Sequence, residues 1–478
     1  MCGILLLSGP ESETRLPLCL NRLAHRGPDD KQTWHQEQLS LGFTRLAING
    51  SLKEGKQPYS YKHWVVTING EIYNHHQLAQ AYDLPTEECD SHIILPLFDK
   101  IGPAIINKLD GFYSSVIINT KTQQAYCLRD HMGKKPLFVG CSNSEVFITS
   151  ELKAINNITW FKVIPLGASE VNLITGEVTQ LKAHQSPKTP GNIKHLLEQS
   201  IYKRMPAENQ PLGLFLSGGL DSSLIASIAS KVREDITYFT LGSSHSPDQK
   251  AVKTIVDTLD LRDVRFISLP SEQELPHLIS QIVYATESYN PSIVSNGLAT
   301  WLLAKEAHKA NIKVVLTGEG ADELFGGYHH FKAADPWQQT RNQLINDMQF
   351  TELRRLDMSS MANGIEARCP FLDSRLRSYS NQLSFDQFYS TNENKVTLRN
   401  SFSGYLPDEI LHRNKTSCDV GSGIRAMVVR YLRRNGRSER EELLEIWKER
   451  FDFDHTQPYF HEYPVFDDLI DQRGATHR

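Results

Sequence analysis

The chain has few cysteines and no long apolar segment. Its 478 residues include seven cysteines, an odd number without a C-x-x-C pair, so we expect neither a disulfide framework nor a structural zinc site. No run of about 18 apolar residues occurs, so we expect no membrane-spanning helix. The start, M-C-G-I-L-L-L-S-G-P, lacks the basic region of a signal peptide. These absences predict a cytoplasmic protein without a membrane partner.

The chain also lacks a strong excess of either charge. Its formal net charge is −5 at pH 7, which argues against a nucleic-acid partner. Two common nucleotide motifs, G-x-x-x-x-G-K-[ST] and G-x-G-x-x-G, are missing. Internal repeats and low-complexity tracts are missing as well. The length of 478 residues leaves room for roughly two or three domains.

A different Gly-rich loop is present at Ser217–Ser223, which reads S-G-G-L-D-S-S. The apolar run Gly213–Leu216 before it predicts a buried strand, and Leu224–Ala229 after it predicts a helix. Backbone N–H groups and the helix N-terminus suit phosphate there. Asp221 would repel phosphate unless a cation lies between them, which points to Mg²⁺. A strand–helix turn with N-capping serines is the alternative.

That loop resembles the loop of the ATP pyrophosphatases, which release pyrophosphate and adenylate an acceptor. The resemblance implies ATP as a substrate and a parallel sheet as the scaffold. Phosphate and Mg²⁺ would then lie at the Ser217–Ser223 loop.

Cys2 is the first candidate catalytic residue. Removal of Met1 would leave it with a thiol and a free α-amine, and such an amine titrates at about pH 7.7–8.0. The amine can then act as the base for the thiol, as in other N-terminal nucleophile enzymes. Taken alone, a cysteine at position two is as well explained by chance.

The N-terminal part looks rich in strands with polar motifs at their ends. The predicted strands are Leu41–Ile48, His63–Ile68, Ser114–Asn119, Val146–Thr149 and Ser169–Leu173. The motifs include A-H-R-G-P-D-D at Ala24–Asp30, F-T-R-L-A-I at Phe43–Ile48, T-I-N-G-E-I-Y-N at Thr67–Asn74, C-D-S-H-I-I at Cys89–Ile94 and T-S-E-L-K-A-I at Thr149–Ile155.

With Cys2, these motifs resemble the class II glutamine amidotransferase domain. The resemblance implies that Cys2 attacks the glutamine carboxamide and that Asn69 and the backbone N–H of Gly70 form an oxyanion hole. Arg45 would hold the α-carboxylate of glutamine, as a guanidinium fork can. The implied glutamine-binding residues are Arg45, Asn69, Gly70, Glu71 and Asp90. For Arg45, Glu71 and Asp90, ordinary surface charge is the alternative.

The pattern changes after Q-S-P-K-T-P-G at Gln185–Gly191, which carries two prolines and reads as a linker. Strand and helix candidates alternate beyond it, which predicts a parallel sheet with ligands at the carboxyl ends of its strands. We therefore expect an α+β N-terminal-nucleophile (αββα) domain at 1–185 and a linker at 186–191. An α/β parallel-sheet ATP pyrophosphatase domain with a helical C-terminal region would follow at 192–478.

A second loop, T-G-E-G-A-D-E-L-F-G-G-Y at Thr317–Tyr328, follows an apolar strand and should face the first loop. Both loops together resemble the synthetase half of glutamine-hydrolysing asparagine synthetases, and the likeness covers nearly the whole chain. The resemblance implies Asp221 and Asp322 as Mg²⁺ ligands and Glu319 as the catalytic residue for the acyl-adenylate. The implied ATP-binding residues are Leu216, Ser217, Gly218, Gly219, Asp221, Ser222, Leu241, Thr317, Gly318 and Lys415.

One segment departs from that family. Glu287–Gly297 reads E-S-Y-N-P-S-I-V-S-N-G, with Ser295 where the family has an arginine and Asn290 where it has an aspartate. Losing a guanidinium weakens the case for an α-carboxylate at that point. Residues 292–297 are polar and contain glycine, so their backbone N–H groups are candidate donors instead.

The expected function is glutamine-dependent amidation of a carboxylate, with aspartate favoured as the acceptor and AMP and pyrophosphate as products. Alternatives are amidation of another carboxylate in cell-surface or secondary-product chemistry, ring closure as in β-lactam synthetases, and an idle regulatory protein. The resemblance allows a homodimer. Residues 425–450 are rich in Arg and Glu and predict a solvated helix with i,i+4 ion pairs, with an interface or nucleic-acid arm as the alternative.

Overall fold

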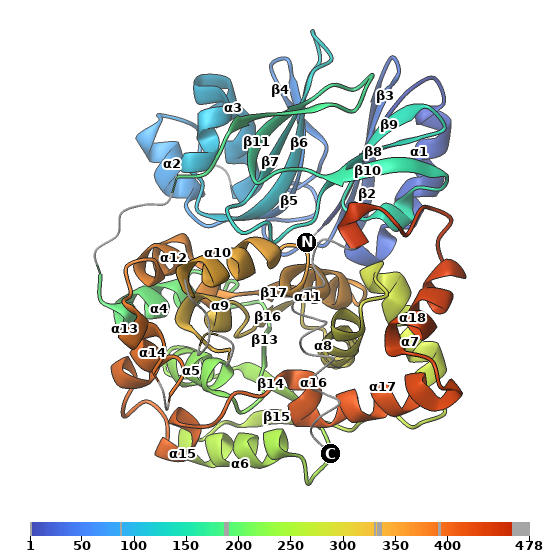
Figure 1. Cartoon of the computed structure of the whole chain (residues 1–478). Coiled ribbons are helices and arrows are strands. Elements are labelled where there is room, and N and C mark those ends of the chain that lie inside the picture. The colour runs from blue at the N-terminus through green and yellow to red at the C-terminus, as the bar shows by residue number, and fades with distance from the viewer. Residues whose placement is uncertain are drawn as a thin grey trace. The chain divides into compact units, whose positions relative to one another are not determined.

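The computed structural model describes residues 2–86, 88–185, 191–328, 331, 337–390 and 393–460. The chain forms two compact units (Figure 1). Among the described residues, the first unit consists of 2–185 with 448–460, and the second consists of 191–447. Positions 186–190 of the predicted linker lie outside the described residues. Residues 448–460 therefore pack with the first unit, although the predicted second domain, 192–478, includes them.

The first unit is built on two antiparallel sheets. One has the strand order β10-β8-β9-β1-β3-β2 and the other the order β12-β11-β7-β6-β5-β4. The strands are β1 (Cys2–Ser8), β2 (Asp30–Gln36), β3 (Leu39–Arg45), β4 (Tyr59–Tyr61), β5 (Trp64–Ile72), β6 (Gly111–Asn119), β7 (Ala125–Arg129), β8 (Phe138–Ser142), β9 (Glu145–Thr149), β10 (Ile158–Val163), β11 (Gly167–Val171) and β12 (Val178–Lys182).

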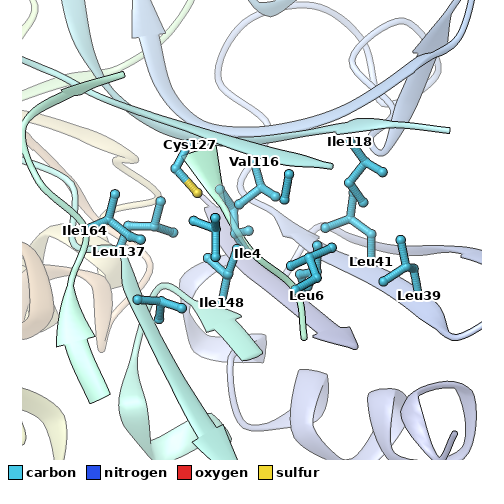
Figure 2. Close-up of a cluster of buried hydrophobic side chains, with 14 of the residues drawn as sticks. Ile4, Leu6, Leu39, Leu41, Val116, Ile118, Cys127, Leu137, Ile148 and Ile164 are labelled. Carbon is cyan, nitrogen blue, oxygen red and sulfur yellow. The ribbon is translucent and has the colours of Figure 1, made fainter. Parts of the chain in front are cut away.

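Alternating apolar residues of both sheets form the core between them. Figure 2 shows Ile4, Leu6, Leu41 and Ile148 of the first sheet close to Val116 and Ile118 of the second. Helix α1 (Ser12–Asn21) packs on β1 and β3, whereas α2 (His75–Ala81) and α3 (Ile94–Ile101) share a separate core with β5 and β6. The helix–sheet–sheet–helix order confirms the predicted αββα class.

The second unit contains a parallel sheet with the order β15-β14-β13-β16-β17. Its strands are β13 (Leu212–Phe215), β14 (Ile236–Leu241), β15 (Asp263–Ile267), β16 (Val314–Leu316) and β17 (Glu366–Arg368). Strands β13 and β16 are neighbours, so the loops that follow them leave the same edge of the sheet. This arrangement confirms the predicted parallel-sheet domain.

Helices make up the rest of the second unit, including its C-terminal region. They are α4 (Ile193–Tyr202), α5 (Leu220–Ala229), α6 (Pro247–Leu259), α7 (Leu275–Thr286), α8 (Pro291–Lys309), α9 (Ala321–Phe325), α10 (Trp337–Asp347), α11 (Glu352–Met361), α12 (Ser374–Ser380), α13 (Phe385–Phe388), α14 (Val396–Ser401), α15 (Asp408–Leu411), α16 (Cys418–Ser422), α17 (Ile424–Leu432) and α18 (Glu439–Lys448). Across the described ranges, none of the helices combines the length and the apolar character that a membrane crossing requires.

Two helix predictions were wrong in detail. The sequence pattern predicts a helix over Leu298–Ala310, but α8 begins at Pro291. Asn290 caps it by accepting the N–H groups of Ser292 and Ile293, and Pro291 fits the first helical position. Residues 425–450 are not one solvated helix either. They form α17 and α18 around a turn at Gly436, whose φ is +75°, and the buried Glu439 on α18 pairs with Arg425 at 2.6 Å.

Candidate active sites

Cys2 starts β1, which lies between β3 and β9 in the first sheet. Its backbone N–H donates to Oδ1 of Asn69 at 2.9 Å, so the N-terminal end of β1 meets β5 of the other sheet. Cys2 is also the register partner of Arg45 on β3. Tertiary pairing thus brings together three predicted site residues that are far apart in the sequence.

The oxyanion-hole pair lies on β5. Asn69 is fully buried, and its Nδ2 atom has no hydrogen-bond partner among the described residues. A buried amide donor without an acceptor is costly unless a ligand satisfies it. Gly70 adopts φ +152°, and a Cβ there would lie 2.1 Å from the carbonyl oxygen of Phe112. Only glycine fits this position, and Asn69 has a free donor for an oxyanion.

Arg45, Glu71 and Asp90 are all buried, so ordinary surface charge does not describe them. The Arg45 guanidinium donates to the backbone carbonyls of Ser51 and Asn49, both at 2.9 Å. The Asn49 side chain in turn donates to Glu71. Asp90 accepts the N–H of Ile72 at 2.7 Å, next to Glu71 in β5. One loop, 49–51, therefore links the Arg45 guanidinium to Glu71.

Glu151 of the motif T-S-E-L-K-A-I is connected to Cys2 through Arg26, a contact that the sequence did not reveal. Arg26 donates through Nε to the Cys2 carbonyl at 3.0 Å and through Nη1 to the fully buried Glu151 at 2.5 Å. Lys153 and His25 also contact Glu151, at 2.7 and 2.9 Å. Burial alone would raise the pKa of Glu151, but these three cationic groups outweigh it and hold the pKa well below its usual range.

In the second unit, the S-G-G-L-D-S-S loop connects β13 to α5 and is held by its own hydroxyls. Ser217 Oγ lies 3.1 Å from Ser222 Oγ and accepts the N–H of Gly219 at 3.3 Å. Gly218 has φ +69°, and a Cβ there would lie 2.7 Å from Ala251. The predicted strand, tight loop and helix start are all present.

The second loop approaches the first. A Cβ on Gly318 would lie 2.9 Å from the Cβ of Asp221, so the loops after β13 and β16 are in contact. Thr317 is fixed at the strand end, where its N–H donates to Arg368 at 3.0 Å. Leu216 and Leu241, at the ends of β13 and β14, are buried. The predicted adenosine-contacting residues thus all lie at one edge of the parallel sheet.

Two lysines join the predicted metal ligands. Lys395 Nζ lies 2.6 Å from Asp221 and 2.5 Å from Asp322, and Lys415 also pairs with Asp322. Burial would raise the pKa of Asp322, but Lys395 and Lys415 lower it far below its usual range. For Asp221 burial dominates and the pKa is raised, with Lys395 opposing. Lys395 begins the run K-V-T-L-R at Lys395–Arg399, but only the fold gives it these partners.

The donor set suits Mg²⁺ bound together with phosphate. The described residues contain no group of three or more His, Cys, Asp or Glu side chains placed to hold a metal ion. Asp221 and Asp322 provide two carboxylates that converge on one cation, Lys395. Mg²⁺ commonly takes one or two carboxylates and completes its shell with water and substrate phosphates. The residues therefore fit a metal that arrives with a nucleotide.

Glu319 is paired with a residue that the sequence did not single out. Its Oε1 accepts from Arg355 of α11 at 2.6 Å, and Arg355 also donates to Thr300 of α8 at 3.1 Å. Glu323 lies in the same loop, where burial, Glu352 and Asp322 raise its pKa to about 8. Arg355 sits in the ordinary amphipathic run of α11, which carries no signal of such a role.

Ser295 is fully buried in α8, and its hydroxyl donates to Asp419 at 2.7 Å. Ser417 Oγ and the N–H of Val420 complete the contacts of that carboxylate, at 2.7 and 2.9 Å. The expectation of free backbone donors at 292–297 was wrong, because helix α8 and its cap Asn290 use these N–H groups. The Ser295 hydroxyl is therefore used in a hydrogen bond to Asp419.

The two units define a class of two-part enzyme, with a glutamine amidotransferase unit followed by a nucleotide-binding parallel-sheet unit. Family models agree: the glutamine amidotransferase domain matches residues 1–188, and asparagine synthase matches 192–349 and 341–457. The chain belongs to the family of glutamine-hydrolysing asparagine synthetases.

Individual asparagine synthetases are similar in sequence to this protein over most of the chain. A probable glutamine-hydrolysing asparagine synthetase of Acanthamoeba polyphaga mimivirus is 30% identical over 447 residues, which span 83% of this chain and 80% of the relative. A synthetase of Zea mays is 29% identical over 88% of this chain and 78% of the relative. One of Lotus japonicus is 30% identical over the same shares.

Proposed function

We propose that this protein is a glutamine-dependent asparagine synthetase. It hydrolyses glutamine at Cys2, activates aspartate with ATP as an aspartyl-adenylate, and uses the ammonia to form asparagine, AMP and pyrophosphate. The observation that carries the proposal is the convergence of Asp221 and Asp322 on Lys395, beside Lys415. Such a cluster, at the edge of a parallel sheet, has the charges that a metal-bound pyrophosphate requires.

In the glutaminase reaction, the Cys2 α-amine takes the thiol proton and the thiolate attacks the carboxamide carbon of glutamine. The oxyanion then accepts hydrogen bonds from Asn69 Nδ2 and the Gly70 N–H, two donors aimed at the developing charge. Arg45 binds the α-carboxylate of glutamine, and Glu71 and Asp90 bind its α-ammonium. Ammonia leaves, and water releases glutamate from the thioester.

In the synthetase reaction, the Ser217–Ser222 loop binds the ATP phosphates, and Leu216, Leu241, Thr317 and Gly318 contact adenosine. Asp221 and Asp322 would hold Mg²⁺, which neutralises the phosphate charge when bound. Lys415 stabilises the leaving pyrophosphate. Glu319, oriented by Arg355, serves the formation and amination of the acyl-adenylate.

Amidation of a different carboxylate is the second candidate, and one observation favours it. Ser295 stands where the resemblance places an arginine and donates to Asp419. That point of the unit therefore presents a carboxylate rather than a guanidinium, and another group has to bind the α-carboxylate of aspartate.

The deciding experiment is an acceptor screen. Purified full-length protein is incubated with ATP, Mg²⁺, glutamine and each of a panel of carboxylates, and pyrophosphate and the amide are measured. We expect asparagine and pyrophosphate in equal amounts with aspartate. Pyrophosphate release with another acid but none with aspartate would establish the second candidate. The same preparations show whether the protein is a homodimer, and cell fractionation tests the predicted cytoplasmic location.

A further inference from the structure

The segment that follows α18 packs against a strand of the glutaminase unit. Residues 451–460, which we name the C-terminal strap, end in a short 3₁₀ turn at Pro458–Phe460. They belong to the same compact unit as residues 2–185, whereas α18 up to Trp447 belongs to the other unit. The strap thus leaves one folded unit and becomes part of the other.

Aromatic rings attach the strap to β8 and β10. Phe453 is 5% exposed and lies edge-on to Phe161 of β10 at 5.9 Å. Tyr459 meets Phe161 at 5.4 Å and Phe138 of β8 at 5.5 Å, and Phe460 meets Phe161 at 6.0 Å. Edge-on contacts at such distances are favourable aromatic geometry. Phe161 is the centre of this cluster and is only 6% exposed.

The strap also covers an open sheet edge. Among the strands that the structure describes, β10 is the last of its sheet and pairs with β8 alone. Beyond that pairing, the N–H groups of Asn157 and Phe161 donate to the strap side chains of Asp452 and Gln457, at 3.1 and 3.4 Å. An uncovered edge strand exposes such donors and invites pairing with other chains. The side chains of the strap satisfy them instead.

We propose that the strap is a second attachment between the two halves of the chain, independent of the linker at 186–191. The linker joins the start of the synthetase half to the glutaminase unit by covalent bonds. The strap joins its end to the same unit by the aromatic cluster and the two edge hydrogen bonds. The glutaminase unit is therefore discontinuous in sequence and takes its final segment from beyond residue 447.

A cut linker tests this proposal directly. A protease recognition sequence replaces residues 186–190 of the full-length chain, and the purified protein is cleaved. We expect the two fragments to co-elute in gel filtration at micromolar concentration. With Phe453→Ala and Tyr459→Ala together, we expect fragment association to weaken on the order of a hundredfold, because the buried Phe453 ring and the half-buried Tyr459 ring lose their contacts with Phe161. With Asp452→Ala and Gln457→Ala together, we expect about a tenfold loss.

Controls separate association from folding. The uncut variants should keep the wild-type circular dichroism spectrum. Ile174→Ala combined with Val232→Ala removes two apolar side chains that are 89% and 55% exposed outside the strap, and these fragments should co-elute like the wild type. Separation of the cut wild-type fragments would overturn the proposal. So would undiminished association of the cut Phe453→Ala, Tyr459→Ala protein. Neither result depends on which acceptor the enzyme uses.

Discussion

In the part of the chain that the structure describes, Asn69 uses only the oxygen of its side-chain amide in a hydrogen bond. Its Oδ1 accepts the N–H of Cys2 at 2.9 Å, and its buried Nδ2 has no hydrogen-bond partner among the described residues. The first contact positions Cys2, the proposed nucleophile. The unused Nδ2 is the proposed donor to the oxyanion. Asp322 is the opposite case, because both Lys395 and Lys415 contact it before any ligand is considered.

The first prediction at this scale concerns Cys2. Cys2→Ala should abolish glutamine hydrolysis and leave synthesis from added ammonia, because the thiol serves only the glutaminase reaction. Glutamate and pyrophosphate are measured with glutamine and with ammonium chloride as nitrogen source. Cys19→Ala, a substitution of another free cysteine, should change neither. Wild-type glutamine hydrolysis by Cys2→Ala would show that the assignment is wrong.

The second prediction at the residue scale concerns the two carboxylates of the nucleotide site, Asp221 and Asp322. Asp221→Asn or Asp322→Asn should lower pyrophosphate release on the order of a hundredfold or more, since each removes charge that holds a metal-bound phosphate. Glutamine hydrolysis should be spared. Asp257→Asn, which changes an exposed residue of α6, is the matched control. Full pyrophosphate release by either site variant would refute the metal role.

At the scale of single elements, one capping residue decides where a helix begins. Asn290 caps α8, so the helix begins at Pro291, seven positions before the periodic apolar pattern becomes clear at Leu298. Asp373 caps α12 by accepting the N–H of Arg375 at 2.9 Å. Asp373 also forms ion pairs. It is fully buried and pairs with Lys203 at 2.5 Å and Arg204 at 3.2 Å, which attach α12 to the end of α4.

This arrangement predicts a pH dependence. Burial would raise the pKa of Asp373, but Arg204 and Lys203 lower it far below the ordinary 3.8. A depressed pKa in the folded state stabilises the protein above pH 3.8, and this contribution is lost as the pH falls below that value. Asp373→Asn keeps a good N-cap but should cost about 3 kcal/mol at neutral pH, because the buried Arg204 and the half-buried Lys203 lose the charge of this carboxylate.

Chemical unfolding at several pH values tests that prediction. The free energy of unfolding of Asp373→Asn should fall less steeply than that of the wild type as the pH decreases from 5 to 3. Asp257→Asn should follow the wild-type curve. Parallel curves for Asp373→Asn and the wild type would contradict the proposed charge role of Asp373.

At the scale of the whole molecule, the chain consists of two compact units with separate cores. Each candidate site lies within one unit, so ligands of the two sites should stabilise different units. Calorimetry should show two unfolding transitions. ATP with Mg²⁺ at a hundredfold excess over its Kd should stabilise one of them by about 2.7 kcal/mol. An electrophilic glutamine analogue that alkylates Cys2 should raise the other. A single transition that both ligands raise would contradict this expectation.

The sequence by itself determined the elements whose signals are local. The αββα class of the first unit was predicted from the resemblance of Cys2 and its accompanying motifs to glutamine amidotransferases. The alternating strand and helix candidates, with the Gly-rich loops at 217–223 and 317–328, predicted the parallel sheet. They also indicated which loops would face each other, because neighbouring parallel strands present their carboxyl ends at one edge. The roles of the individual site residues remain predictions until the variants above are measured.

Only the tertiary structure decided the contacts between distant residues. Lys395 and Asp221 are 174 positions apart, Ser295 and Asp419 are 124 apart, and Phe161 and Gln457 are 296 apart. No local propensity encodes such a pair, because each partner is an ordinary lysine, serine or glutamine until the sheets and helices pack. The same reason hid Arg26, Glu151 and Arg355, whose contacts arise from the packing of separate elements.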